Sequence, residues 1–105
     1  MEKELSCSKF TAILADNNRN YLRLISDFLA ETGRFCVTEY AFDGRQAVEL
    51  VLKLKPDLFV VDLIMPVLDG FAVLEELARS GCNSHTRVVM TSAVALDFIL
   101  KKAEN

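Results

Sequence analysis

Apolar residues follow two different patterns along the chain. Short runs rich in apolar and β-branched residues lie at 10–15, 35–41, 58–61 and 87–92. The longer stretches between and after them carry apolar residues every three to four positions, the spacing of one helix face. The pattern predicts four strands, each followed by a helix. Connections of helix length favour a parallel α/β sheet with right-handed crossovers.

The helical stretches have recognisable ends. The first begins near Asn18 and stops at Gly33, a residue type that commonly ends helices, and the second stops before Pro56. The third ends near Gly81, and the fourth covers 95–103. The expected apolar faces are Tyr21, Leu24, Ile25 and Phe28; Ala47, Val48, Val51 and Leu52; Phe71, Leu74, Leu77 and Ala78; and Leu96, Ile99, Leu100 and Ala103.

The third strand raises a question about function. Its residues, "LFVV" at 58–61, are apolar at every position, which suits a strand covered by helices on both faces. It runs directly into Asp62 and then into a loop broken by proline. Since an acid is a poor core residue unless it is paired or solvated, Asp62 is expected where the strand reaches the surface.

The ends of the other strands carry polar residues as well. In a flavodoxin-like sheet of order 2-1-3-4, the ligand crevice lies beyond the carboxyl ends of strands 1 and 3. Strand 1 is followed by Asp16 and Asn17, and strand 4 ends in Thr91 and Ser92. Two carboxylates, an amide and a hydroxyl suit Mg²⁺, and a carboxylate beside Mg²⁺ is a candidate nucleophile toward phosphorus. The alternatives remain helix capping by Asp16, Asn17, Asn18 or Ser92, and an ordinary strand-end acid at Asp62.

Composition narrows the classes of protein. The 105 residues are 51% hydrophobic with a formal net charge of -3, which fits one domain and lacks the basic footprint of a nucleic-acid binder. Residues 1–9 form a polar leader, too polar for a signal peptide, and 10–105 form the domain. No segment is long enough to span a membrane, and three scattered cysteines suggest a reducing compartment, so a cytoplasmic location is expected. His85 lies in a polar loop with no evident partner, and the sequence leaves open whether Tyr40 and Phe42 form surface contacts.

Three segments together carry a family resemblance. With "ILADNN" after strand 1, "VVDLIMPVLDG" around strand 3 and "VVMTSA" at strand 4, the chain resembles the receiver domain of two-component response regulators. Within that family, "LADNNR" and "VVDLIMPVLDGFAVLE" are most similar to receivers of sporulation-initiation transcription factors of spore-forming bacteria. The resemblance extends from about Phe10 to the C-terminus.

The resemblance implies a role for each matching position. Asp62 would accept a phosphoryl group from a histidine kinase or phosphotransferase, and Ser92 would be the switch hydroxyl. Mg²⁺ would be held by Asp16, by Asp62 and by the backbone carbonyl of Ile64. Such a protein is a signalling switch rather than a metabolic enzyme, and it would control transcription through an output domain outside this chain. We expect no contact of this segment with nucleic acid or with a membrane.

Two departures from the family pattern matter. Asn17 stands where the family usually has a second acid; its side-chain carbonyl oxygen could still bind the Mg²⁺, but it brings no charge, so weaker Mg²⁺ binding is expected. The family ends with a fifth strand, which carries a lysine, and a fifth helix, whereas this sequence stops at Asn105. A four-stranded sheet would leave strand 4 as an open edge. The expectation is a homodimer that exchanges or shares elements, or a monomer of low stability.

Three rival functions remain at this point. A pseudo-receiver would keep the fold and act as an interaction module without phosphorylation, in line with Asn17. A magnesium-dependent phosphatase with an aspartate nucleophile usually has a second acid two residues later, where this chain has Ile64. A flavin protein would need a phosphate-binding loop after strand 1, and "DNNRN" lacks the glycines and hydroxyls for one.

Overall fold

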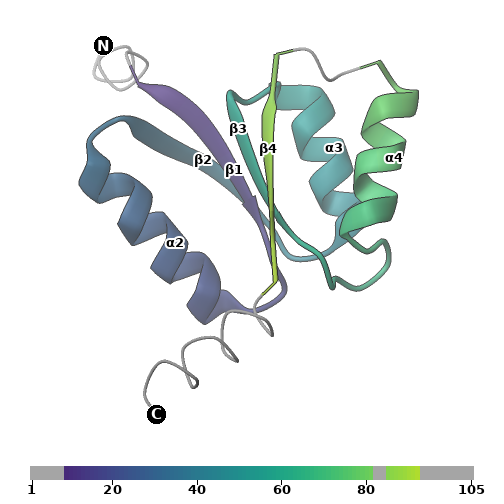
Figure 1. Cartoon of the computed structure of the whole chain (residues 1–105), viewed down its shortest axis with the longest axis horizontal. Helices are drawn as coiled ribbons and strands as arrows, with labels where there is room; N and C mark the ends of the chain where they lie inside the picture. The colour runs from purple at the N-terminus through teal and green to yellow at the C-terminus, as the bar shows by residue number, and fades with distance from the viewer. Residues whose placement is uncertain (1–8, 82–84, 93–105) are drawn as a thin grey trace.

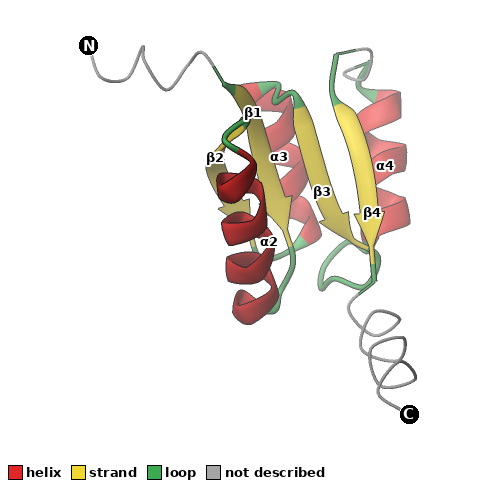
Figure 2. Ribbon diagram, turned by 60° about the vertical axis from the view of Figure 1, so that its left-hand side comes forward, coloured by secondary structure: helices red, strands yellow, loops and turns green. Residues whose placement is uncertain are grey.

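The computed structural model describes residues 9–81 and 85–92, which form a parallel sheet with helices on both faces (Figures 1 and 2). Four strands lie in the order β2-β1-β3-β4. They are β1 (Phe10–Ala15), β2 (Phe35–Ala41), β3 (Leu58–Asp62) and β4 (Arg87–Thr91), and all three neighbouring pairs are parallel. The flavodoxin-like sheet of order 2-1-3-4 is confirmed.

Three helices connect the strands. They are α2 (Arg19–Thr32), α3 (Gly44–Leu54) and α4 (Gly70–Arg79). Helix α2 lies on one face of the sheet, and α3 and α4 lie side by side on the other (Figure 1). The helix predicted over 95–103 and most of the polar leader lie outside the described residues. Within the described part, no helix is long and apolar enough to cross a membrane.

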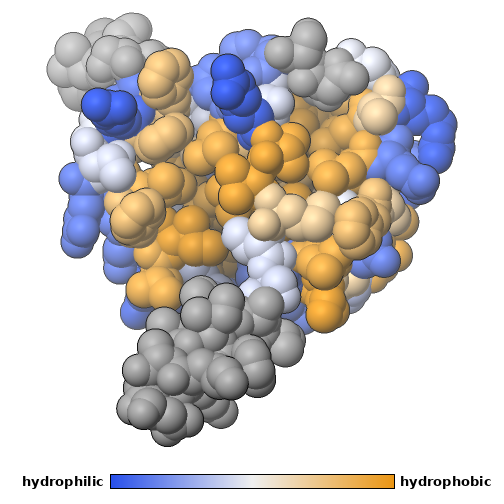
Figure 3. Space-filling model, viewed as in Figure 1, coloured by the Kyte–Doolittle hydropathy of each residue, from blue (hydrophilic) through white to orange (hydrophobic). Residues whose placement is uncertain are grey.

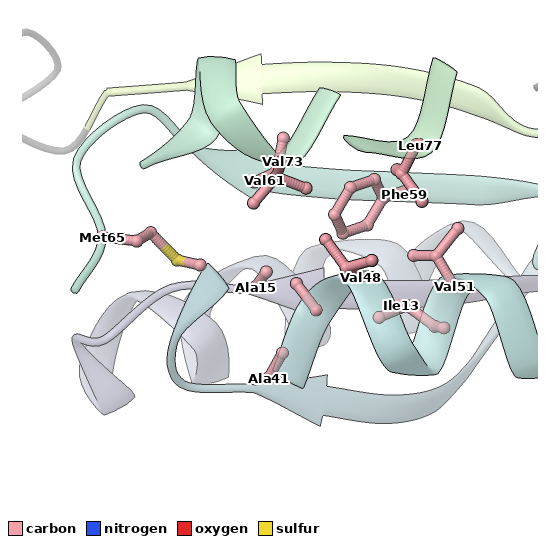
Figure 4. Close-up of a cluster of buried hydrophobic side chains, with 11 residues drawn as sticks. Ile13, Ala15, Ala41, Val48, Val51, Phe59, Val61, Met65, Val73 and Leu77 are labelled. Atoms are coloured by element: carbon pink, nitrogen blue, oxygen red, sulfur yellow. The ribbon is translucent and has the colours of Figure 1, made fainter. Parts of the chain in front are cut away.

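Two apolar clusters fill the spaces between sheet and helices. The larger cluster lies under α3 and α4, with the fully buried Phe59 ring among aliphatic side chains (Figure 4). The smaller cluster lies under α2 and includes Leu14, Leu22 and Val60. Phe59 and Val60 are neighbours in β3 and belong to different clusters. Strand β3 is therefore covered on both faces, as its apolar run predicts.

Local side-chain hydrogen bonds explain where each helix begins. Asn18, Asp43 and Asp69 are the N-caps of α2, α3 and α4, and each side chain accepts from backbone N–H groups of the first turn. The capping expectation for this region is confirmed at Asn18, one residue after Asn17. Gly33 ends α2 in the left-handed conformation, with φ of 73°.

The predicted buried faces of two helices are partly wrong. In α2 the buried residues are Leu22 and Leu29, whereas Leu24 and Phe28 are 59% and 65% exposed. This helix carries two overlapping apolar stripes, and spacing alone does not tell which one faces the sheet. In α4, Val73 and Leu77 are buried while Phe71 is exposed. The expected face of α3 is confirmed, with Ala47, Val48 and Val51 buried.

The two outer strands differ in regularity: β2 contains a register shift, and β4 does not. Strand β2 contains a register shift opposite Ala12 and Ile13, which leaves Thr38 without a direct partner in β1. Its hydroxyl donates instead to the Ala12 carbonyl oxygen. Strand β4 is regular, and Val88 and Val89 are 42% and 48% exposed. Figure 3 shows apolar surface over the part of the molecule where β4 runs.

Candidate functional site

Two carboxylates meet where the order of the strands reverses. Asp16 follows the last residue of β1 and Asp62 is the last residue of β3, and these strands are paired in register up to Ala15 and Val61. Asp16 is 3% exposed and Asp62 is 5% exposed. They are the only buried charged or polar side chains among the described residues. The crevice predicted at this edge is therefore lined by two buried acids on adjacent strands.

Asp16 is held in a fixed geometry by the backbone around it. Its own N–H donates to the Ala41 carbonyl at the end of β2 (3.0 Å), and its Oδ1 accepts from the Asn18 N–H (2.8 Å). Burial is the main cause that raises the pKa of the Asp16 carboxyl, and the charge of Asp62 raises it further. Hydrogen bonds from the backbone of Asn18 and Asn17 oppose this rise. The site therefore favours a proton or a cation on Asp16.

The chain directly after Asp62 is fixed to β4 and to α4. The Leu63 N–H donates to the Thr91 carbonyl, and the Leu63 carbonyl accepts from the Gly70 N–H, both at 2.8 Å. A Cβ atom on Gly70 would lie 2.8 Å from the carbonyl oxygen of Asp62 and 2.9 Å from the Cα of Leu63. A side chain at position 70 would therefore force the backbone of the phosphoacceptor candidate to shift.

The tip of the same loop is strained. The Leu68 N–H donates to the Pro66 carbonyl at 2.8 Å, which closes a three-residue turn around Val67 at φ of 70°. A positive φ is a true outlier for a β-branched residue. The Pro66 carbonyl also accepts from the Gly44 N–H at 3.1 Å, so the turn rests on the beginning of α3. There is no room for a side chain on Gly44, since its Cβ would lie 2.0 Å from the Leu68 carbonyl oxygen.

The remaining site candidates are distributed around the two acids. Thr91 is paired with Asp62 across β3 and β4, and Ser92, which is half-buried, comes next in the chain. Asn17 is exposed. The Ile64 side chain is 62% exposed, so only its backbone could face the acids. Asp16, Asp62 and Ser92 thus share one edge of the sheet, and Asn17 lies at its solvent side.

The donor set suits a hard divalent cation. Within the described residues, no group of three or more His, Cys, Asp or Glu side chains could hold a metal ion. The two buried acids would therefore be supplemented by backbone or amide oxygens and by water, which is how proteins usually bind Mg²⁺. Burial raises the pKa of Asp16, the charge of Asp62 raises it further, and a bound cation would offset both effects.

One contact between titratable residues could not be expected from the sequence. His85 is exposed as expected, but its Nε2 lies 2.9 Å from Oδ1 of Asp57 at the opposite, amino end of the sheet. Asp57 Oδ2 accepts from the Thr11 N–H (2.8 Å) and hydroxyl (3.2 Å). The Thr11 backbone hydrogen bond is the main cause that lowers the pKa of Asp57. The sequence offered no signal, because the two contacting residues come from separate loops.

Comparisons with known proteins agree with the geometry. The model of the response regulator receiver domain matches residues 12–104. The signal receiver domain of the putative response regulator NarL from Mycobacterium tuberculosis is 28% identical with a TM-score of 0.75, over 81% of this chain and 67% of that one. The Francisella response regulator 1452 receiver domain is 32% identical with a TM-score of 0.73, over 81% and 67%.

A third solved structure contains a metal. The receiver domain of the sensor histidine kinase PA1611 from Pseudomonas aeruginosa PAO1 is 26% identical with a TM-score of 0.74, over 84% of this chain and 70% of that one. A magnesium ion is coordinated in its active-site cleft. The present chain spans about two-thirds of the length of these three structures. With the family model matched over residues 12–104 and the acids at the expected edge, the chain belongs to the response regulator receiver domains.

Proposed function

We propose that this chain is a phosphorylation-controlled switch whose Asp62 accepts a phosphoryl group from a histidine kinase or phosphotransferase. Phosphoryl acceptance is typical of the family. The observation that carries the proposal is the pair of buried acids, Asp16 and Asp62, on adjacent strands at the switch point of the sheet. Two like charges in a buried site are costly, and such cost is typical of functional sites.

The proposed chemistry assigns one step to each group. A carboxylate oxygen of Asp62 attacks the phosphorus of a phosphohistidine, an O–P bond forms, and the N–P bond breaks. The imidazole nitrogen that leaves takes up a proton from water. A bound Mg²⁺ would neutralise charge on the transferring phosphoryl group. Asp16, Asp62 and the Ile64 carbonyl would hold the ion, and the amide oxygen of Asn17 would be a weaker contributor.

The proposed switch uses the hydroxyl of Ser92. Ser92 directly follows Thr91, which is paired with Asp62, so Ser92 lies at the same edge of the sheet as the acid. A phosphoryl group on Asp62 would attract this hydroxyl and shift the segment after β4 between two arrangements. The switch would act in the cytoplasm on an output domain outside the described residues. The output we propose is control of transcription, specifically of sporulation. The sequences of the two motifs around Asp16 and Asp62 support this, since they are similar to those of receivers of sporulation-initiation transcription factors.

The test is intact-mass analysis after incubation with acetyl phosphate, with and without Mg²⁺. One phosphoryl adduct that needs Mg²⁺ and is lost in Asp62→Asn supports the proposal. Asp69→Asn is the matched control, because Asp69 is an exposed N-cap of α4 and asparagine also caps helices. A folded wild-type chain that forms no adduct would contradict the proposal.

Asn17 favours a second candidate function. Because the amide supplies no charge where the family usually has an acid, a pseudo-receiver that acts through protein contacts alone is the alternative. Asn17→Asp distinguishes the two. If the site binds Mg²⁺, the added charge tightens Mg²⁺ binding and speeds adduct formation, whereas in a pseudo-receiver it changes neither.

Self-association remains a prediction. Among the described residues, β4 has no neighbour on its outer side and exposes Val88 and Val89. Open strand edges with apolar side chains favour association. Sedimentation of this chain tests the prediction, and a well-behaved monomer with a cooperative thermal transition would contradict it.

A further inference from the structure

One flank of α2 faces β2 across a groove that has no part in the proposed chemistry. The groove has a cavity volume of about 340 Å³. Its α2 residues recur at the spacing of a single helix face, and its other wall comes from β2 and the residue that follows it. The lining residues are Arg19, Leu22, Arg23, Ser26, Asp27, Tyr40 and Phe42. Figure 2 shows α2 at the β2 side of the sheet.

Two arginines at the start of the groove are available for a ligand. Arg19 and Arg23 lie one helical turn apart, and neither forms an ion pair with another residue in the described part of the chain. The Arg19 guanidinium lies 4.3 Å from the centroid of the Phe42 ring. Stacking holds the planar guanidinium in place and leaves its N–H edge free for bidentate contact with a carboxylate. The groove thus presents positive charge on a chain whose net charge is -3.

The remainder of the groove combines a buried leucine with a pair of hydroxyl groups. Leu22 is 4% exposed and forms the floor. The Tyr40 hydroxyl lies 2.9 Å from the Ser26 hydroxyl, which ties β2 to α2 across the groove. Tyrosine and arginine are the residues most enriched where protein interfaces derive their binding energy. The combination is that of a contact surface rather than of a solvated helix face.

We propose that this groove, lined by Arg19, Arg23, Tyr40 and Phe42, is a docking surface for an acidic segment of a partner protein. Carboxylates of the segment pair with the two arginines, and one apolar side chain packs onto Leu22 and Phe42. Asp27, two turns after Arg19, repels acid at the far end and so sets the direction of the segment. The proposal goes beyond phosphoryl acceptance and does not depend on it.

Short peptides test the proposal on the full chain. The probe is an acetylated, amidated hexapeptide EELFEE, with KKLFKK as the reversed-charge control. In ¹⁵N NMR titrations, EELFEE is expected to shift the amides of Arg19, Ser26 and Tyr40, and its affinity should fall as salt rises. KKLFKK should leave those amides unchanged. Shifts that map elsewhere, or equal binding of both peptides, would overturn the proposal.

Matched variants separate the groove from general charge. Arg23→Glu should weaken binding of EELFEE by about tenfold or more, because it replaces an attraction with a repulsion. Arg45→Glu makes the same charge change at an exposed position on α3 and should leave the affinity unchanged. Equal weakening by both variants would overturn the proposal. Since Arg23 is exposed, Arg23→Glu should fold, and Arg23→Gln offers a milder second variant. Binding should persist in Asp62→Asn, so failure of phosphoryl acceptance and failure of docking are distinguishable.

Discussion

Replacing Gly70 by alanine tests how tightly the backbone at Asp62 is held. The added Cβ would lie 2.8 Å from the Asp62 carbonyl oxygen, and ordinary contact begins at 3.4 Å. The backbone of β3 or of the start of α4 must therefore move by about 0.6 Å. The neighbouring atoms are main chain, so no flexible side chain can absorb the movement.

The expected effects on stability and on activity differ in size. Overpacking costs about 1–3 kcal/mol, and the lower entropy of unfolded alanine returns about 0.4–1 kcal/mol, so Gly70→Ala should lose about 1–2 kcal/mol of unfolding free energy. A misplacement approaching 1 Å at a reacting group can slow a reaction about a hundredfold. The rate of adduct formation at Asp62 should therefore fall about tenfold or more.

Gly33→Ala is the matched control for this prediction. At φ of 73° alanine is strained by about 1–2 kcal/mol, but no atom lies within 4 Å of the added Cβ. Gly33 lies between α2 and the beginning of β2, at the opposite end of the sheet from the acids. Urea denaturation measures both stabilities, and intact-mass kinetics with acetyl phosphate measure both rates. If Gly70→Ala forms the adduct as fast as Gly33→Ala does, the close approach of the backbone does not position Asp62.

Three further predictions concern strain and charge. Val67→Gly should raise the unfolding free energy, measured by urea denaturation, by about 0.5–2 kcal/mol, because relief of about 1–3 kcal/mol of backbone strain exceeds the entropic cost of glycine. A lower unfolding free energy would show that the turn is unstrained. Asp16→Asn should be more stable than wild type, and the difference should grow as the pH rises above 3.8, because the raised pKa of Asp16 means that its ionised form is unfavourable in the fold. A difference that does not change with pH would contradict this. Asp57→Asn should be less stable above pH 3.8, with the difference shrinking as the pH falls and the wild-type carboxyl takes up its proton, and a pH-independent difference would contradict the lowered pKa.

The sequence predicts the sheet well because its signals are local. Each strand is a compact apolar run bounded by polar residues, and the observed β1 and β2 have the predicted limits. Strand β3 extends one residue further than expected, to include Asp62. Helix-length connections predict parallel strands, and the flavodoxin-like strand order then places the acids at one edge. The edge that carries Asp16 and Asp62 could therefore be predicted without coordinates.

What escaped prediction depends on contacts between distant segments. Leu24 and Phe28 lie on an apolar stripe of α2, but the sheet buries the neighbouring stripe of Leu22 and Leu29. The close contact of His85 with Asp57 joins residues from two loops, and no periodicity marks it. The strain at Val67 likewise arises only when the loop meets the beginning of α3.

The repulsion between the two acids and the backbone strain at Val67 both involve the end of β3 and the loop that follows it. Asp62 ends β3, and the loop that follows it is fixed by Gly70 on one side and by the beginning of α3 on the other. A group that neutralises Asp16 and Asp62 removes their repulsion, while the strained turn persists because its hydrogen bonds come from backbone groups outside the acid pair. Neutralisation of the acids therefore changes the energy of the site without releasing the loop. The loop is thus a rigid support beside the acids, fixed by backbone hydrogen bonds that their charge does not control.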